Sequence, residues 1–344
     1  MKQTLKTFNL TFTAPLHISD ARLDYGSSGR MIHSDTIYAA VIAALARTGN
    51  LPEKVEQSGD LGCTISSLFP FTVVEGQLIC FFPRPFISVN QDDENIGLAK
   101  KMKKVKWLDQ PYFEAVINRQ EKSIGDEEKN MISGEFLSEY DLKDHTIMFT
   151  QTVPRAKIPR SKAEDEGETT IFYMERILFS EGSGLYLIVD GDTSLLEKGL
   201  HILQYEGIGT DRSIGQGTFT LLPGENIDLK IPETDQYVTT LGLLCTEEKD
   251  VNKLIEAENG SSAKRARWDL IHRGGWLTTE GYNGIRKKSV YMFTEGSVFY
   301  TGKPGIQISG MVNCNIKPDD TEGLQLPDHP VWRCGRTIAI PVQI

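Results

Sequence analysis

The stretch that decides the fold is residues 185–222, which read LYLIVDGDTSLLEKGLHILQYEGIGTDRSIGQGTFTLL. Alternating apolar residues over 185–189 predict a strand. A helix from Asp192 follows, with leucines recurring on one side. The chain then passes through the glycine-rich segment 207–217, called the glycine loop below, and continues as a strand over 218–222. Strand, helix, loop and strand form the second half of a β-α-β-β-α-β unit.

The beginning of the chain supplies the first half of that unit. Apolar residues alternate over 8–12 and predict a strand that ends at Pro15. Ser34 is the predicted N-cap of an apolar helix, with Asp35 in its first turn. Two apolar runs between residues 61 and 82 predict a pair of strands. The fold class is therefore α+β.

Two domains are expected, because 344 residues exceed the usual size of one domain. We predict a first, ferredoxin-like domain over 1–230, interrupted by an insertion at about 84–170 that is rich in charge and in short helical signals. Residues 231–344 start again with a strand and a set of hairpin-like runs. They predict a second, degraded α+β unit.

The overall charge opposes general nucleic-acid binding, but the charge is unevenly distributed. Lys and Arg number 37 against 47 Asp and Glu, which gives a formal net charge of −10. Three windows, 100–106, 154–162 and 264–288, carry +5, +4 and +5. A solvated face explains any single window, whereas three of them in an acidic chain indicate local contact with a polyanion.

Several functional classes are excluded by missing signals. No apolar run is long enough to span a membrane, and the N-terminus lacks the apolar segment of a signal peptide. The five cysteines and six histidines have no spacing typical of a zinc site or a disulfide framework. We therefore predict a cytoplasmic protein without membrane contact, metal or cofactor.

The glycine loop is the most informative segment for function. It holds four glycines in eleven residues, and it is neither a dinucleotide fingerprint nor a P-loop, because the third glycine and the Gly-Lys-Ser/Thr are missing. A tight helix-to-strand connection explains one or two of these glycines. Four of them predict backbone N–H groups open to a phosphate.

Motifs along the chain together resemble one family. They are Pro15-Leu16-His17-Ile18, Ile32-His33-Ser34-Asp35-Thr36-Ile37, Phe82-Pro83-Arg84-Pro85, the lysines of 101–106, the segment from Leu203 through Gly217, Lys287 to Phe293 and Glu295 to Phe299. In this order they resemble the fourth Csm subunit of type III-A CRISPR effector complexes, a RAMP protein of the Cas-five group that acts in antiviral defence.

The resemblance implies two tandem ferredoxin-like (RRM-like) domains with a thumb-like insertion. It implies a non-catalytic RNA-binding subunit that caps the 5′ repeat-derived tag of the crRNA and bridges the polymerase-like large subunit to the backbone RAMP subunit of the Csm complex. With the basic windows, it predicts an RNA-binding set of thirteen residues: His17, Arg155, Lys157, Arg160, Gly207, Gly209, Thr210, Arg212, Ser213, Gly215, Gly217, Lys287 and Lys288.

An enzymatic alternative stays open from the sequence. RAMP proteins of this fold class include metal-independent endoribonucleases that process repeat RNA, and His17 or His33 could act as the general base. A small-molecule α/β enzyme is disfavoured, because the cofactor fingerprints are missing.

Overall fold

The computed structural model describes residues 1–18, 25–87, 101–122, 130–157, 170–233, 236–246, 251, 254, 266–277, 285–301, 311–313 and 329–344. Its helices are α1 (Ser34–Arg47), α2 (Glu53–Ser58), α4 (Gln110–Ile117), α6 (Ser194–Glu206) and the short 3-10 helix η1 (Arg212–Ile214). Its strands are β1 (Lys2–Phe12), β2 (Cys63–Ile65), β3 (Phe69–Val74), β4 (Gln77–Pro83), β5 (Trp107–Asp109), β6 (Met131–Ile132), β7 (Phe136–Leu137), β8 (Met148–Lys157), β9 (Thr170–Phe179), β10 (Gly184–Gly191), β11 (Phe219–Pro223), β12 (Ile227–Lys230), β13 (Tyr237–Thr240), β14 (Leu270–Arg273), β15 (Val290–Phe293), β16 (Val298–Tyr300), β17 (Met311–Asn313), β18 (Trp332–Cys334) and β19 (Ala339–Pro341).

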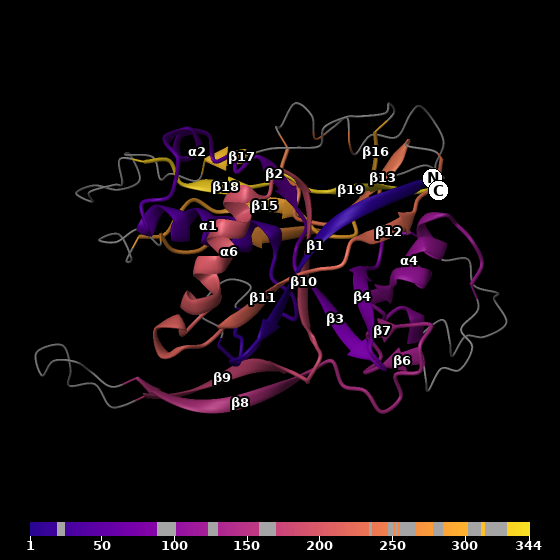
Figure 1. The fold of residues 1–344 in the computed structure, drawn as a ribbon, viewed down its shortest axis with the longest axis horizontal. Coiled ribbons are helices and arrows are strands. Elements are labelled where there is room, and N and C mark those ends of the chain that lie inside the picture. Colours follow the sequence, from indigo (N-terminus) through magenta and orange to yellow (C-terminus); the bar gives the residue numbers. More distant parts are fainter. Residues whose placement is uncertain are drawn as a thin grey trace, which may run out of the picture.

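A large sheet forms the centre of the molecule (Figure 1). In the described residues its strands follow the order β11-β1-β10-β3-β4-β5-β7-β6, while β12 pairs with the start of β1 and β2 pairs with the end of β10. The pairings among β11, β1, β10 and β3 are all antiparallel. The expected mixed α+β fold is confirmed.

Both faces of this sheet are buried, and β10 shows why. Its alternate residues Leu185, Leu187 and Val189 pack with α1 and α6, whereas Tyr186 and Ile188 pack on the opposite side. A strand covered on both faces must be apolar at successive positions, as the sequence of β10 is.

Helices α1 and α6 lie side by side on one face of the sheet (Figure 1). Gly199 permits their close approach, because a Cβ atom at this position would lie 2.6 Å from Cγ1 of Val41. The apolar stripes predicted for both helices bury against β1 and β10.

The opposite face is covered by α4 and by strands from the C-terminal part. Leu241, Val298, Ile338 and Ile340 belong to the same buried cluster as Tyr186 of the central sheet. Strands β16, β13 and β19 form a separate small sheet. The two parts of the chain, before and after residue 230, therefore share one hydrophobic core.

The insertion expected over 84–170 has two structural roles. Its first part supplies the helix α4 and the strands β5, β6 and β7, and these strands continue the central sheet. Its second part begins the long hairpin β8–β9, which projects along the lower edge of the molecule in Figure 1 and extends to Phe179. Residues 158–169, which include the acidic run 164–168, lie outside the described residues.

One local prediction is wrong. The N-cap of α1 is His33, not Ser34, and no side chain caps this helix end. The Ser34 hydroxyl instead accepts the backbone N–H of Leu243 at 2.9 Å. A tertiary contact with the C-terminal part takes the place of the local cap.

Among the described helices, none is long and apolar enough to cross a membrane.

Candidate nucleic-acid interface

The glycine loop lies where three distant segments of the chain meet. It connects α6 to β11, and it contacts the residues that follow β1. The N–H of Gly217 donates to the Pro15 carbonyl at 2.9 Å, and the N–H of Thr210 donates to the His17 carbonyl at 3.1 Å. Leu16 in turn forms a β-bridge with Ile177 of β9. The base of the β8–β9 hairpin is thereby fixed beside the loop.

Three of the four glycines are needed for packing inside the protein. Gly207, Gly209 and Gly217 all have positive φ, and a Cβ atom at each would collide with a backbone oxygen at 2.4 Å or less. The oxygens belong to Gln216, His17 and Ile208, respectively. The N–H groups of Gly207 and Gly217 donate to the carbonyls of Leu203 and Pro15. The shape of all three glycines serves close backbone packing, and phosphate contact by the loop stays a prediction.

Gly215 differs from the other three glycines. Its φ is +81°, but a Cβ atom added here would have no other atom within 4 Å. It follows η1, so Arg212, Ser213 and Gly215 form the outward end of the loop. Ile214, between them, is largely exposed. The part of the loop that faces outward is thus short and centred on residues 212–215.

Arg155 of β8 is held against this loop by an ion pair. Its Nη2 lies 3.1 Å from Oδ2 of Asp211, and both side chains are about one-third exposed. Asp211 has the left-handed backbone conformation, with φ of +62°. The pair positions a guanidinium group of the hairpin beside the loop, where it remains accessible to an anion.

Three buried polar atoms border the loop without a hydrogen-bond partner among the described residues. They are Nε2 of His17, Nε of Arg155 and Oε1 of Gln216. The His17 ring is fully buried, and its Nδ1–H donates to the Glu175 carbonyl at 2.5 Å, so Nε2 is left as the second polar atom of the ring. Buried polar groups are seldom left unpaired. A polar ligand at this loop would supply the missing partners.

The structure brings most of the predicted RNA-binding residues together. His17, Arg155 and the seven loop residues lie in one place, which we call the loop site. Lys157 ends β8 on the same hairpin, with its side chain outside the described part. Arg160 falls within 158–169 and so lies outside the described residues.

Lys287 and Lys288 are not at the loop site. They belong to the C-terminal part and precede β15, which Figure 1 places beside α1, away from the β8–β9 hairpin. Gln216, Asp211 and Glu175 were missed by the sequence prediction. Only Gln216 and Asp211 carried a signal, because both lie within the glycine loop.

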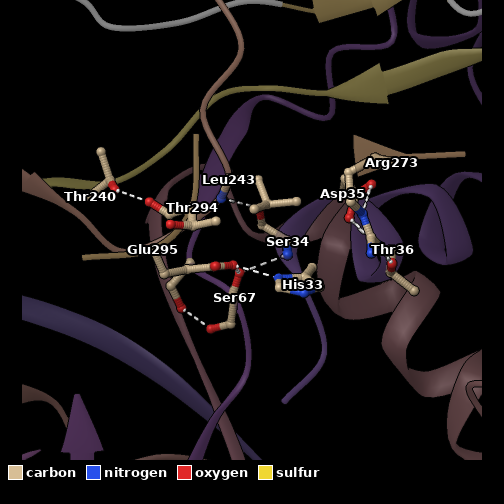
Figure 2. Close-up of polar contacts among 12 residues, drawn as sticks. His33, Ser34, Asp35, Thr36, Ser67, Thr240, Leu243, Arg273, Thr294 and Glu295 are labelled. Carbon is tan, nitrogen blue, oxygen red and sulfur yellow. Dashed lines mark hydrogen bonds and ion pairs between the residues drawn. The ribbon is translucent and has the colours of Figure 1, made fainter. Parts of the chain in front are cut away.

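His33, the second histidine considered as a base, occupies a different, buried site (Figure 2). Its Nδ1 donates to Oε1 of Glu295 at 2.9 Å, and both side chains are buried. The Ser67 hydroxyl donates to the same carboxylate oxygen, and the Ser34 N–H donates to the Ser67 hydroxyl at 2.8 Å. This histidine connects the start of α1 to the C-terminal part.

Asp35 extends this connection with two arginines. Its carboxylate accepts from Nε and Nη2 of Arg273 at 3.1 and 3.0 Å, and it also pairs with Arg333. Burial by itself raises the pKa of Asp35, but the two guanidinium groups outweigh it and hold the pKa well below its usual range. Burial likewise opposes the lowered pKa of Glu295, which His33 and Ser67 bring about.

We call this cluster the α1 joint; it comprises His33, Ser34, Asp35, Ser67, Arg273, Glu295 and Arg333. Each of its acids is matched by a base from a distant part of the sequence. No group of His, Cys, Asp and Glu in the described residues has the arrangement of a metal site.

Together these features define the class of protein: an α+β chain whose two parts share one core, with an anion-compatible loop at the base of a projecting hairpin. The family model described as "CRISPR Csm4 C-terminal domain" matches residues 233–342. A curated "CRISPR system Cms protein Csm4" of Streptococcus thermophilus is 24% identical over 302 residues, covering 86% of this chain and 89% of the relative. A protein of the same name from Thermococcus onnurineus (strain NA1) is 24% identical and covers 80% and 83%.

Solved structures agree with these sequence relatives. A Csm3–Csm4 subcomplex of the type III-A CRISPR-Cas interference complex contains a chain that matches with a TM-score of 0.59 and 16% identity, covering 98% of this chain and 100% of that one. A Csm1–Csm4 cassette in complex with cA4 matches with a TM-score of 0.56 and 19% identity, covering 99% of both chains. The resemblance expected from the motifs is confirmed: the chain is similar to Csm4 proteins of CRISPR systems over most of its length.

Proposed function

We propose that the chain is a subunit of a type III-A CRISPR effector complex that binds the 5′ repeat-derived tag of the guide RNA at the loop site. The observation that carries this proposal is that three buried atoms at the loop site, Nε2 of His17, Nε of Arg155 and Oε1 of Gln216, have no hydrogen-bond partner among the described residues, next to a loop whose residues 213–215 are exposed. Phosphates and base edges of RNA supply the donors and acceptors that such atoms need.

The position in the complex is proposed from the relatives. Solved Csm4 chains occur together with Csm1 in one set of structures and with Csm3 in another. We propose that this chain likewise bridges a polymerase-like large subunit and a backbone RAMP subunit. The antiparallel order β11-β1-β10-β3, with α1 and α6 on one face, supports a ferredoxin-like first domain, and we propose a second one after residue 230.

We further propose that the subunit does not itself cut RNA. A general base must come within hydrogen-bond reach of the hydroxyl that it activates. The Nδ1 of His33 is engaged by a buried carboxylate, and the Nδ1–H of His17 donates to the Glu175 carbonyl, so both rings are held by contacts within the protein. These positions favour RNA binding over the endoribonuclease alternative.

The test exploits two glycines with the same geometry. Gly215 of the loop and Gly76 of the β3–β4 turn both have φ of +81° and open space at the Cβ position. Gly215→Asp adds a negative charge where the RNA phosphates are expected, whereas Gly215→Asn adds nearly the same shape without charge. We expect the purified effector with the Asp variant to contain about one-tenth of the guide RNA found with the Asn variant, or less.

Gly76→Asp is the matched control, and it should leave the guide RNA content unchanged. Equal RNA content in the Gly215→Asp and Gly215→Asn complexes would contradict RNA binding at the loop. Cleavage of repeat RNA by the purified full chain in EDTA would contradict the proposed lack of catalysis.

A further inference from the structure

The strands β14 and β15 form a two-stranded ribbon in the C-terminal part, which we call the aromatic ribbon. Four residue pairs join the strands, from Leu270 opposite Phe293 to Arg273 opposite Val290. The pairing continues beyond the strands, where Trp276 bridges Arg286 and the Leu277 N–H donates to the Ile285 carbonyl at 2.8 Å.

One part of the aromatic ribbon is firmly anchored in the protein. Arg273 reaches Asp35 of the α1 joint, and Met292 and Phe293 are buried. The anchoring explains why this ribbon keeps a defined shape although it belongs to no larger sheet in the described residues.

Aromatic rings nevertheless face outward from the aromatic ribbon. Tyr291 is 68% exposed and Trp276 is 46% exposed. The β15 residue Tyr291 lies directly opposite His272, with ring centroids 5.0 Å apart. Exposing large rings to water is unfavourable, and exposed rings grouped on one element mark an interaction surface.

The charge around these rings is positive. The Arg286 guanidinium lies over the Trp276 ring at 4.7 Å from its centroid, and Lys288 is exposed nearby in the sequence. The acid described within this segment is Asp269, whose carboxylate accepts the Leu270 N–H at 2.8 Å. Exposed rings beside exposed cations provide stacking surfaces for bases and partners for phosphates.

We propose that the outward side of the aromatic ribbon binds a single-stranded polynucleotide, with bases stacked on Trp276 and Tyr291 and phosphates at Arg286 and Lys288. This site is separate from the loop site. A purely apolar protein contact would not require the local excess of positive charge in a chain with a net charge of −10. Stacking accepts any base, so the proposed binding has little sequence preference.

The experiment measures binding of the full chain to fluorescein-labelled 20-nucleotide oligouridine and oligodeoxythymidine by anisotropy. We expect Tyr291→Ala and Trp276→Ala each to weaken binding about tenfold, and Tyr291→Phe to retain it, because Phe keeps a ring for stacking. Leu270→Ala is the matched control: Leu270 is an exposed, non-aromatic residue of the same ribbon, and its removal should leave affinity unchanged.

Salt dependence separates stacking from phosphate contact. Lys288→Ala should lower the slope of log affinity against log salt by about one, because one phosphate contact is lost. Tyr291→Ala should leave this slope unchanged while lowering affinity at every salt concentration.

Photocrosslinking identifies the bound strand. In the assembled effector, 5-iodouridine is placed either in the guide RNA or in a separate single strand, and crosslinked peptides are mapped by mass spectrometry. Crosslinks to Trp276 or Tyr291 from either strand support the proposal and show which strand is bound. In the Gly215→Asp complex, crosslinks from a separate strand should persist, and crosslinks from the guide RNA should persist when counted per guide RNA retained. A failure of the loop site is therefore distinguishable from a failure of the aromatic ribbon.

Two results would overturn the proposal. One is unchanged affinity in the Tyr291→Ala and Trp276→Ala chains, with melting temperatures showing that both are folded. The other is a ribbon that crosslinks only to a protein subunit in the assembled effector. Beyond these two, an equal loss of oligonucleotide affinity in Leu270→Ala would show that binding does not depend on the aromatic rings, and would overturn the proposed stacking.

Discussion

The loop site and the α1 joint are both built around a histidine near the start of the chain, yet they differ in how their polar groups are satisfied. In the joint, His33 meets Glu295 and Asp35 meets two arginines. At the loop site, His17 engages one ring nitrogen with a backbone carbonyl and leaves the other unpaired among the described residues. The joint thus matches its charges within the protein, although Oε2 of Glu295 and Nε of Arg333 have no hydrogen-bond partner among the described residues. The loop site has three such atoms and, in the part of the chain that the structure describes, only the partly exposed Arg155–Asp211 pair beside them.

The largest effect is expected when the central acid of the joint is removed. Asp35→Asn leaves two buried guanidinium groups without their anion. We expect the free energy of unfolding to fall by about 3–5 kcal/mol. Chemical denaturation of the full chain, followed by circular dichroism, measures this change.

Asp60→Asn is the control for that substitution. Asp60 pairs with Arg336 at 2.7 Å, but both side chains are partly exposed. A loss of about 0–1 kcal/mol is expected there, as for exposed ion pairs in general. Equal losses in the two variants would show that the joint is no more important for stability than a surface pair.

The second comparison lies within the glycine loop itself. In Gly217→Ala the new methyl group would lie 1.9 Å from the Ile208 carbonyl oxygen, whereas in Gly215→Ala it would meet open space. Both substitutions carry the cost of a positive φ, about 1–2 kcal/mol. Overpacking adds about 1–3 kcal/mol for Gly217→Ala alone.

Thermal unfolding of the two chains tests this difference. The melting temperature of Gly217→Ala should be the lower one by several degrees. A Gly215→Ala chain that is the less stable of the pair would show that the tip, and not the packed base of the loop, determines its stability.

The smallest effect is expected from Arg155→Ala. The ion pair with Asp211 is about one-third exposed, so its loss should change stability by about 0–1 kcal/mol. Loss of one phosphate contact should nevertheless weaken binding of tag RNA and reduce the salt slope by about one. Anisotropy titrations at several salt concentrations measure both quantities.

Arg336→Ala is the matched variant, because it removes an arginine from a similarly exposed pair away from the loop. Its RNA affinity should equal that of the unsubstituted chain. Identical salt slopes for the Arg155→Ala and Arg336→Ala chains would exclude Arg155 from the RNA contact.

Local pattern predicted the elements around the loop site well. The alternation of β10, the apolar side of α6 and the glycines of the loop are all visible in consecutive residues. The sequence could not show that three glycines pack against backbone oxygens, because those oxygens belong partly to His17 and Ile208, which only the tertiary fold brings close.

Such local patterns could not predict the α1 joint. Arg333 and Asp35 are 298 positions apart, and no local signal marks Glu295 or Arg333 as partners of the first helix. The same reason explains why the predicted N-cap of α1 was wrong, since the Ser34 hydroxyl accepts the backbone N–H of Leu243. Lys287 and Lys288 were included in the RNA-binding set because of a basic window and a family motif, and neither of these indicates position in the fold.

The separation of Asp35 from Arg333 also has a consequence for synthesis. A ribosome that adds ~5–20 residues per second needs on the order of 15–60 s to cover that distance. During this interval the start of α1 has no Arg333 with which to pair. The nascent chain therefore completes this helix end only when its final strands emerge, and a chain released before Arg333 lacks one of the two counter-charges with which the buried Asp35 pairs.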